Sequence, residues 1–489
     1  MKYKVDHLNG RNEKNKKNNI HNFTINPKGN INENLEIIES LFPTSDLVKK
    51  ILMIDGKPAL LIYLTGLVNE QKIDSFINNI ISQKKDFEIF VNNNTESSIR
   101  IAKIEKSVLD GKSILFLDGV SSAFIYSTEN PPHRTFMPPN IDNSLKGSRI
   151  SFVETYQANI ALLRRFIHNR NFRTKQTEIG NENKSIVSIA YLDRVVDEKL
   201  LISVENRISE IKVDSVLNAN QLAQLMERNQ FSPFPQILTT ERPDEAASAI
   251  LKGKIVLILD RSSEVIILPS EFISFFTSID DYSSRTLVAS FNRLLRIVAF
   301  LITLYLPGLY IAIVSFNYEV MPLKLLFSIG ESRARVPFDP LFEAIIMEIT
   351  LEMLREAGIR LPAPISTTVG VVGGIVIGQA AVQAGIVSNI MVIVVALTAI
   401  SSFIIPKYEM ASSLRLLRFP IMVMASLFGI FGLVVSTMIL IVHGLSLKSY
   451  NTSYTSPLSP LIFTQLKDTF IRMPLNYLWK NQNKNIKKD

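Results

Sequence analysis

The sequence predicts an α/β soluble N-terminal region of two similar subdomains, followed by an α-helical multi-pass membrane domain. Three observations predict this fold class. Residues 35–280 alternate short apolar runs with amphipathic helical ones, which is typical of an α/β region. Two strings within that region recur in the same order. Residues 361–406 contain no Asp, Glu, Lys or Arg, a stretch about twice the roughly 20 apolar residues that one helix needs to cross a bilayer.

The composition of the 489-residue chain excludes several kinds of chemistry. It has a net charge of +8 and no cysteine, which excludes disulfides, thiolate catalysis and Cys-ligated metals. Residues 1–34 are rich in Asn and Lys and are predicted to form a disordered arm. No apolar signal-peptide core follows the arm, so the soluble region is expected to stay in the cytoplasm. The basic ends carry no nucleic-acid motif, so no nucleic-acid partner is expected, and they suit the anionic cytoplasmic leaflet.

An internal repeat organises the soluble region. Residues 62–80 (IYLTGLVNEQKIDSFINNI) align with 190–208 (AYLDRVVDEKLLISVENRI), and 111–118 (GKSILFLD) align with 253–260 (GKIVLILD). The two matches occur in the same order, so one duplication with small insertions explains both. The predicted boundaries are 1–34 for the arm, 35–140 and 141–280 for two cytoplasmic α/β subdomains, 281–447 for a transmembrane domain and 448–489 for a basic C-terminal tail.

No catalytic motif emerges from the soluble region. The Gly-Lys-Ser at 111–113 invites a phosphate-loop interpretation, but Lys106 occupies the position where the first glycine of that loop must turn. The second copy repeats the Gly-Lys without the Ser, which favours a turn that enters a strand. The five histidines show no metal-ligand spacing. We therefore expect no enzyme activity, no cofactor and no metal site.

The uncharged stretch from Leu361 to Pro406 is predicted to form a helical hairpin that turns at residues 385–389. Its first helix carries glycines at spacing four, so one face of that helix has positions without side chains, where another helix can pack closely. Two glutamines, again four apart, form a polar strip that should not face lipid. Two interpretations remain open: ordinary helix packing or a water-lined pathway. The residues concerned are Gly370, Gly374, Gly378, Gln379 and Gln383.

An acidic helix at 341–357 precedes the hairpin. Glu348, Glu352 and Glu356 stack at spacing four, so this helix either lies at the membrane interface or spans it with carboxylates facing a polar lumen. Four spans would place both termini in the cytoplasm. If the acidic helix is a fifth span, the two termini lie on opposite sides of the membrane. The predicted spans are 297–318, 365–384, 390–405 and 419–443. Glu348 and Glu352 join the glycines and glutamines as candidate pore or helix-packing residues.

Five strings in the second half of the chain are distinctive. They are ERPDEAASAI (241–250), LREAGIRLPAPI (354–365), GQAAVQAGIVS (378–388), IVVALTAISSFIIP (393–406) and LRLLRFP (414–420). These strings resemble the A subunits of the GerA family of spore germination receptors. The resemblance covers about residues 140–475 and is looser in the first subdomain and both tails. It implies a multi-pass protein of the spore inner membrane with a cytoplasmic N-terminal domain.

The resemblance also implies partners and an activity. The expected partners are a transporter-like B subunit that senses the nutrient, a lipoprotein C subunit, the lipid bilayer and further copies of this chain. The copies are expected to form a homo-oligomer, in this family a pentamer, that acts as a germinant-gated cation channel. Two alternatives are a non-conducting scaffold subunit and the paralogous member associated with dipicolinate release. A secondary transporter is disfavoured because the repeat lies in the soluble region and not across the spans.

Overall fold

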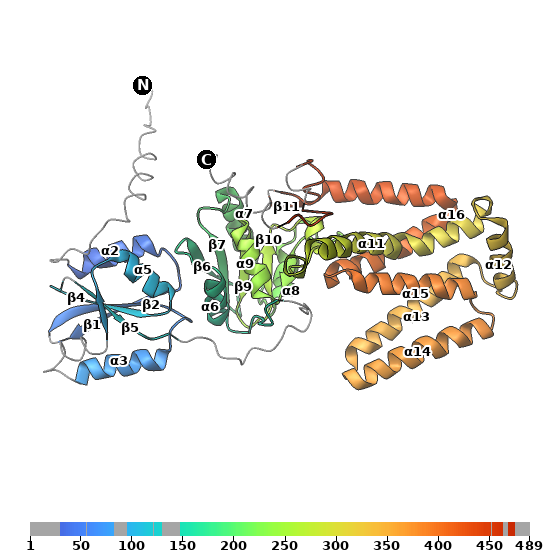
Figure 1. The fold of residues 1–489 in the computed structure, drawn as a ribbon. Coiled ribbons are helices and arrows are strands. Elements are labelled where there is room, and N and C mark those ends of the chain that lie inside the picture. The colour runs from blue at the N-terminus through green and yellow to red at the C-terminus, as the bar shows by residue number, and fades with distance from the viewer. Residues whose placement is uncertain are drawn as a thin grey trace, which may run out of the picture. The chain divides into compact units, whose positions relative to one another are not determined.

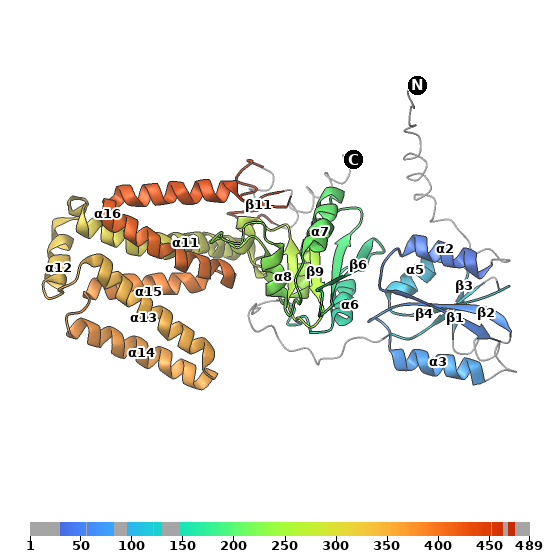
Figure 2. The same cartoon turned by 180° about the vertical axis from the view of Figure 1, so that it is seen from behind.

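The computed structural model divides the chain into two compact units, each of which is described by itself (Figures 1 and 2). The first unit holds the α/β region and the second holds the apolar helices. The structure describes residues 30–54, 56–82, 95–120, 122–129, 147–450, 452–462 and 468–474. The predicted disordered arm, except its last residues, lies outside the described residues.

The first subdomain is a five-stranded antiparallel sheet with helices on both faces. Helices α2 and α5 share one core with the sheet, and α3 packs in a second core on the opposite face (Figure 1). The strand order is β1-β2-β4-β5-β3. The elements are α2 (Ile31–Leu41), β1 (Leu47–Ile54), β2 (Lys57–Leu64), α3 (Glu70–Ser82), β3 (Glu96–Ser98), α5 (Ile101–Leu109), β4 (Ser113–Leu117) and β5 (Ala123–Tyr126).

The second subdomain repeats this topology. Its sheet has the order β6-β7-β9-β10-β8, which is the order of the first sheet strand for strand. Tyr63 and Tyr191, from the two repeated strings, each stand one residue before the end of β2 and of β7. The prediction of two similar subdomains is therefore confirmed. The elements are α6 (Tyr156–Phe166), β6 (Phe172–Ile179), β7 (Ser185–Leu192), α7 (Glu198–Glu210), α8 (Ala219–Met226), β8 (Leu238–Thr240), α9 (Pro243–Leu251), β9 (Ile255–Leu259) and β10 (Val265–Leu268).

The two repeated strings meet each other inside each subdomain. Gly111 and Gly253 have φ of 87° and 86°, a left-handed conformation that favours glycine. A Cβ on Gly111 would lie 2.7 Å from the Leu67 carbonyl oxygen, and one on Gly253 would lie 2.8 Å from the Val195 carbonyl oxygen. Both carbonyls come from the turn after the Tyr-Leu strand. The Gly-Lys pair is thus a strand-entry turn in both copies, as its repetition predicted.

A buried ion pair joins the two subdomains. Arg164 of α6 donates from Nε to Asp46 Oδ2 at 2.5 Å and from Nη2 to Asp46 Oδ1 at 2.8 Å, and both side chains are 1% exposed. Thr44 and Thr174 donate to the same carboxylate. Burial raises the pKa of the Asp46 carboxyl, but the Arg164 charge and these hydrogen bonds outweigh it and leave the pKa below its usual value.

The second unit is helical. Its long apolar helices are α11, of 30 residues, and α16, of 39 residues, and by length and composition both could cross a membrane. The helix predicted at 341–357 is α13, and the predicted hairpin is α14 and α15, which turn at Gly385. The bounds are η2 (Phe272–Phe275), α10 (Asp280–Ser283), α11 (Thr286–Ser315), η3 (Tyr318–Val320), α12 (Leu323–Arg333), α13 (Pro340–Arg360), α14 (Ala363–Gln383), α15 (Asn389–Ile404) and α16 (Tyr408–Ser446).

Helix α16 is broken at Gly429, inside the span predicted at 419–443. The φ of 59° and ψ of −140° at Gly429 interrupt the helix, and its two lengths fold back on each other (Figures 1 and 2). A Cβ here would lie 2.9 Å from Phe316 Cβ. Asn317 Oδ1 accepts a hydrogen bond from Ile430 N at 3.2 Å and so caps the second length. This corrects the expectation of one continuous helix in this stretch.

Candidate functional site

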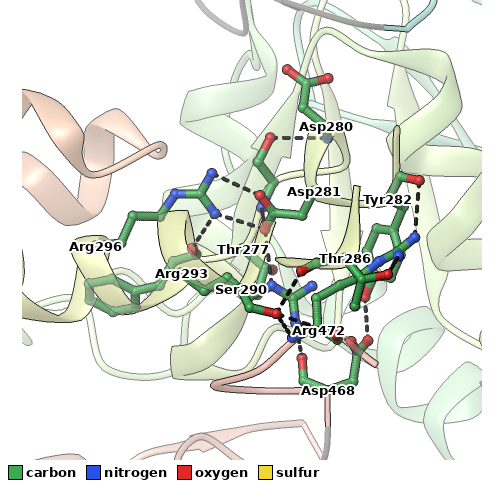
Figure 3. Close-up of polar contacts among 12 residues, drawn as sticks. Thr277, Asp280, Asp281, Tyr282, Thr286, Ser290, Arg293, Arg296, Asp468 and Arg472 are labelled. Carbon is green, nitrogen blue, oxygen red and sulfur yellow. Dashed lines mark hydrogen bonds and ion pairs between the residues drawn. The ribbon is translucent and has the colours of Figure 1, made fainter. Parts of the chain in front are cut away.

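A cluster of charged side chains fixes the start of α11 (Figure 3). Asp281, in the short helix α10, is 3% exposed. Its Oδ2 accepts from Arg293 Nε at 3.1 Å and from Arg296 Nη1 at 2.8 Å. Helix α11 begins at Thr286, so both arginine side chains extend toward the N-terminal end of their own helix and contact α10, which precedes it. The paired charges therefore hold the angle at which the chain enters α11.

Tyr282 connects this cluster to a distant part of the chain. Its hydroxyl donates to Asp468 Oδ2 at 2.5 Å, and the centroid of its ring lies 5.5 Å from Arg293 Cζ and 5.9 Å from Arg472 Cζ (Figure 3). Burial first, and then the Asp468 carboxylate, raise the pKa of the Tyr282 hydroxyl to about 12. We call Asp281, Tyr282, Arg293, Arg296, Asp468 and Arg472 the junction cluster.

The C-terminal segment is docked on the first turns of α11. Arg472 donates from Nη1 to Thr286 Oγ1 at 2.7 Å, and its backbone N donates to Ser290 Oγ at 3.2 Å. Arg472 is only 4% exposed. We call residues 447–450, 452–462 and 468–474 the strap. The sequence predicted a basic tail here, and the part that the structure describes is held by specific contacts.

Aromatic side chains join the strap to the loop at 227–238, which the second unit includes although the chain on either side belongs to the first. Phe234 contacts Phe272 edge-on at 6.0 Å between ring centroids, and Phe272 contacts Phe300 of α11 at 6.1 Å. Tyr454 of the strap donates from its hydroxyl to the Pro235 carbonyl at 2.8 Å. The end of α16 takes part as well, because His443 Nε2 lies 2.9 Å from Ser232 Oγ.

The candidate carboxylates of α13 lie in a different environment from the one expected of a lumen. Glu348 and Arg418 are both 0% exposed, and Arg418 Nη1 donates to Glu348 Oε1 at 2.7 Å. Glu352 is 27% exposed, forms an ion pair with Arg355 of its own helix and lies 3.6 Å from Arg415. In the sequence, Arg415 and Arg418 come just before the span predicted at 419–443. Their pairing with α13 depends on contacts between residues about 70 positions apart and was not foreseen.

Sequence reasoning missed a second buried carboxylate of α13. Glu343 of α13 is fully buried and accepts hydrogen bonds from both the backbone N, at 2.5 Å, and the hydroxyl of Ser388. Ser388 is the N-cap of α15, and its Oγ also accepts a hydrogen bond from Met391 N at 3.2 Å. A Ser before an apolar run is a signal for a helix start. The sequence contained that signal, but it could not show that Glu343 accepts hydrogen bonds from this Ser.

The glycine face and the glutamines of α14 are open within the described chain. A Cβ on Gly370 or Gly374 would meet no described atom within 4 Å, whereas one on Gly373 would lie 2.7 Å from Leu354 Cδ2 of α13. A Cβ on Gly378 would meet only Val392 Cγ1, at 3.9 Å, among the atoms described. Gln379 and Gln383 are exposed. Their use in a pore or in packing stays a prediction.

The described residues contain no group of three or more His, Cys, Asp or Glu placed to hold a metal ion. The described part of the second unit thus has three features: the junction cluster holds the start of α11, buried ion pairs join α13 to α16, and the glycine face and the glutamines of α14 are open.

Comparisons with known proteins agree with a membrane role. Residues 35–484 match the family described as Bacillus/Clostridium GerA spore germination protein. The chain is 36% identical to Uncharacterized membrane protein YfkQ of Bacillus subtilis (strain 168), over 91% of this chain and 89% of that protein. It is 38% identical to Spore germination protein KA of the same organism, over 84% of this chain and 78% of that protein.

Two further similarities concern germination proteins. Spore germination protein A1 of Bacillus subtilis (strain 168) is 33% identical over 93% of this chain and 95% of its own length. The crystal structure of the N-terminal domain of the A subunit of the Bacillus megaterium spore germinant receptor GerK3 aligns with 51% of this chain and 98% of that one. The TM-score of that alignment is 0.41 and the sequence identity is 25%.

Proposed function

Because the chain belongs to the GerA family of spore germination proteins, we propose that it is the A-type membrane subunit of a germinant receptor in the spore inner membrane. In this proposal the α/β subdomains lie in the cytoplasm and B and C subunits complete the receptor. Copies of this chain form a ring, a pentamer in the expectation from the family, around a cation path. The observation that carries the proposal is the open helix α14.

The helix connections support a membrane placement for this proposal. We place α11, α13, α14, α15 and both lengths of α16 across the bilayer, so that the chain returns to the side from which it started. The contacts of Asp468 and Arg472 with the start of α11 support this placement, because residues in contact must lie on the same side. The strap and the N-terminal region are then both cytoplasmic.

Helix α14 has three distinct sides. Gly373 faces α13 of the same chain. At about 100° per residue, Gly370 and Gln379 point in directions about 180° apart. An open small-residue side and an open polar side on opposite flanks suit a head-to-tail contact with two neighbouring copies, which is the geometry that closes into rings. The arc between them, with Val371 at 56% and Ile375 at 55% exposure, would face the lumen.

The buried pair Glu348–Arg418 has a different place in this proposal. Glu348 has no exposed surface and its charge is neutralised by the Arg418 guanidinium at 2.7 Å, so it adds little negative potential to a lumen. The pair instead fixes α13 against α16 behind α14. The proposed lumen therefore belongs to α14 and not to the acidic helix, and Glu352, which is 27% exposed, is the carboxylate nearer to water.

Cysteine crosslinking tests the ring, and the chain contains no cysteine of its own. In a head-to-tail ring, the double variant Gly374→Cys/Gln379→Cys treated with a short bismaleimide should give a ladder of covalent oligomers. Either single variant should stay monomeric. A two-fold dimer would instead crosslink through one single variant and stop at two chains. A ladder without ion current in reconstituted bilayers would favour the scaffold alternative.

A further inference from the structure

Helix α12 (Leu323–Arg333) differs in direction from the other helices of its unit. Figures 1 and 2 show it running across the ends of α11 and α15, at the end of α11 that is remote from the junction cluster. It follows the short turn η3, and α13 begins shortly after it. A helix that lies across the ends of spanning helices lies parallel to the plane of the bilayer.

Only one side of α12 contacts the rest of the described chain. Ile329 is 6% exposed, and Leu326 and Arg333 are half-buried. These three residues recur at spacings of three and four, so they share one helix face. Ser332 borders this face: it is also half-buried, and its Oγ accepts a hydrogen bond from Asn389 N at 3.2 Å. The other faces of α12 are open among the described residues.

Most of the open part of α12 is divided into an apolar side and a polar side, and Leu325, which is 49% exposed, lies at the border between the polar side and the packed side. Leu323 and Phe327, four residues apart, are 70% and 73% exposed. Lys324, Ser328 and Glu331 are exposed about 100° further around the helix. The apolar side adjoins the packed side, and the polar side turns away from it.

We propose that the apolar side of α12 inserts into the interfacial layer of the lipid bilayer, on the side opposite the junction cluster, while its polar side faces water. A helix with this division lies in the plane of the interface. Two features favour lipid over a protein partner. The apolar side continues into exposed Val320 (67%) and Tyr318 (52%), and Tyr is enriched at membrane interfaces. Helix α12 also runs across the end of α11 (Figures 1 and 2), whose exposed side chains face lipid in the proposed function, on which this inference rests.

Tryptophan quenching in reconstituted vesicles tests the inference. Trp479, the one tryptophan of the sequence, is first replaced by Phe, and Phe327→Trp is introduced in the full chain. The vesicles are phosphatidylcholine with a fraction of lipid brominated either near the carbonyl end or near the methyl end of its acyl chains. Ser328→Trp on the polar side is the matched control. Leu301→Trp, at an exposed position of α11, is the depth reference.

We expect the tryptophan of Phe327→Trp to be quenched several-fold more by bromine near the carbonyl end than by bromine near the methyl end. The tryptophan of Ser328→Trp should be quenched by neither lipid, because it faces water. The tryptophan of Leu301→Trp should show the opposite depth preference to that of Phe327→Trp, because it lies deeper in the bilayer.

Two results would overturn the inference, and a third concerns the proposed function. If Leu301→Trp is quenched from the methyl end but Phe327→Trp is quenched no more than Ser328→Trp, the placement of α12 is wrong while the membrane assignment holds. If bromine fails to quench Phe327→Trp and aqueous iodide fails as well, a protein surface covers this side and the inference also fails. Loss of quenching in Leu301→Trp would overturn the membrane placement itself.

Discussion

Arg418 and Glu348 depend on each other because both are 0% exposed. Removing one partner leaves a buried charge without compensation. Glu348→Gln should therefore destabilise the chain by about 3–5 kcal/mol. Glu356→Gln is the matched control, since Glu356 on the same helix pairs with Arg360 while 61% exposed, and it should cost at most about 1 kcal/mol. Thermal unfolding in detergent, followed by size-exclusion chromatography, measures both. Equal losses would contradict the buried pairing.

Asp46 gives a pH-dependent prediction at the same scale. Its folded pKa lies below the ordinary value of 3.8, so its contribution to stability is fully present above that ordinary value and is lost as the pH falls through the lower folded value. Asp46→Asn should destabilise the subdomain pair at pH 7 because Arg164 loses its partner. The difference in unfolding temperature between wild type and variant should shrink below about pH 4. A difference that stays constant down to pH 2 would contradict the pairing.

The strap is the element with the clearest role. Arg472→Ala removes charged hydrogen bonds to α11, at a cost of about 2 kcal/mol, and should raise the fraction of undocked strap about 30-fold. Limited proteolysis within the strap measures that fraction. Ile471→Ala, at a neighbouring side chain that is 55% exposed, should cleave at the wild-type rate. Wild-type cleavage in Arg472→Ala would show that the docking does not depend on this residue.

The break in α16 gives a second prediction for an element. Gly429→Ala places a Cβ at positive φ and 2.9 Å from Phe316 Cβ, so it should cost about 2 kcal/mol or more. Gly444→Ala is the control, because its Cβ would meet only Thr455 Cγ2, at 3.8 Å, among the described atoms. That change should be neutral or slightly stabilising. Unfolding temperatures of the two variants decide the matter, and a harmless Gly429→Ala would mean that the helix is continuous.

The elements also show what the sequence predicted and what it did not. The two subdomains were predictable because repeated Tyr-Leu and Gly-Lys strings mark equivalent strands and turns. The break at Gly429 was not predictable. Residues 428–432 are uncharged like the rest of the apolar stretch around them, and glycine is common in membrane helices. The junction cluster was equally hidden. Tyr282 and Asp468 are 186 positions apart, and neither belongs to a periodic pattern.

For the whole molecule, assembly through α14 can be separated from folding by two neighbouring glycines. A Cβ on Gly374 would meet no described atom within 4 Å, so Gly374→Leu should reach the membrane but lose oligomers, and Gly374→Ala should be much milder. Gly373→Leu collides with Leu354 of the same chain and should lower the amount of folded protein. Membrane abundance and crosslinked oligomers measure the two effects. Normal oligomers and normal germination with Gly374→Leu would show that this face does not pack.

The central claim is that copies of the chain surround a cation path lined by α14, and current recording in planar bilayers tests it most directly. The purified chain should give cation-selective unitary currents, which a charged thiol reagent blocks in Ile375→Cys. Wild type has no cysteine and should be unaffected, as should Ile400→Cys on α15, at a side chain that is 60% exposed. Absence of unitary currents, or block at Ile400→Cys without block at Ile375→Cys, would contradict the claim.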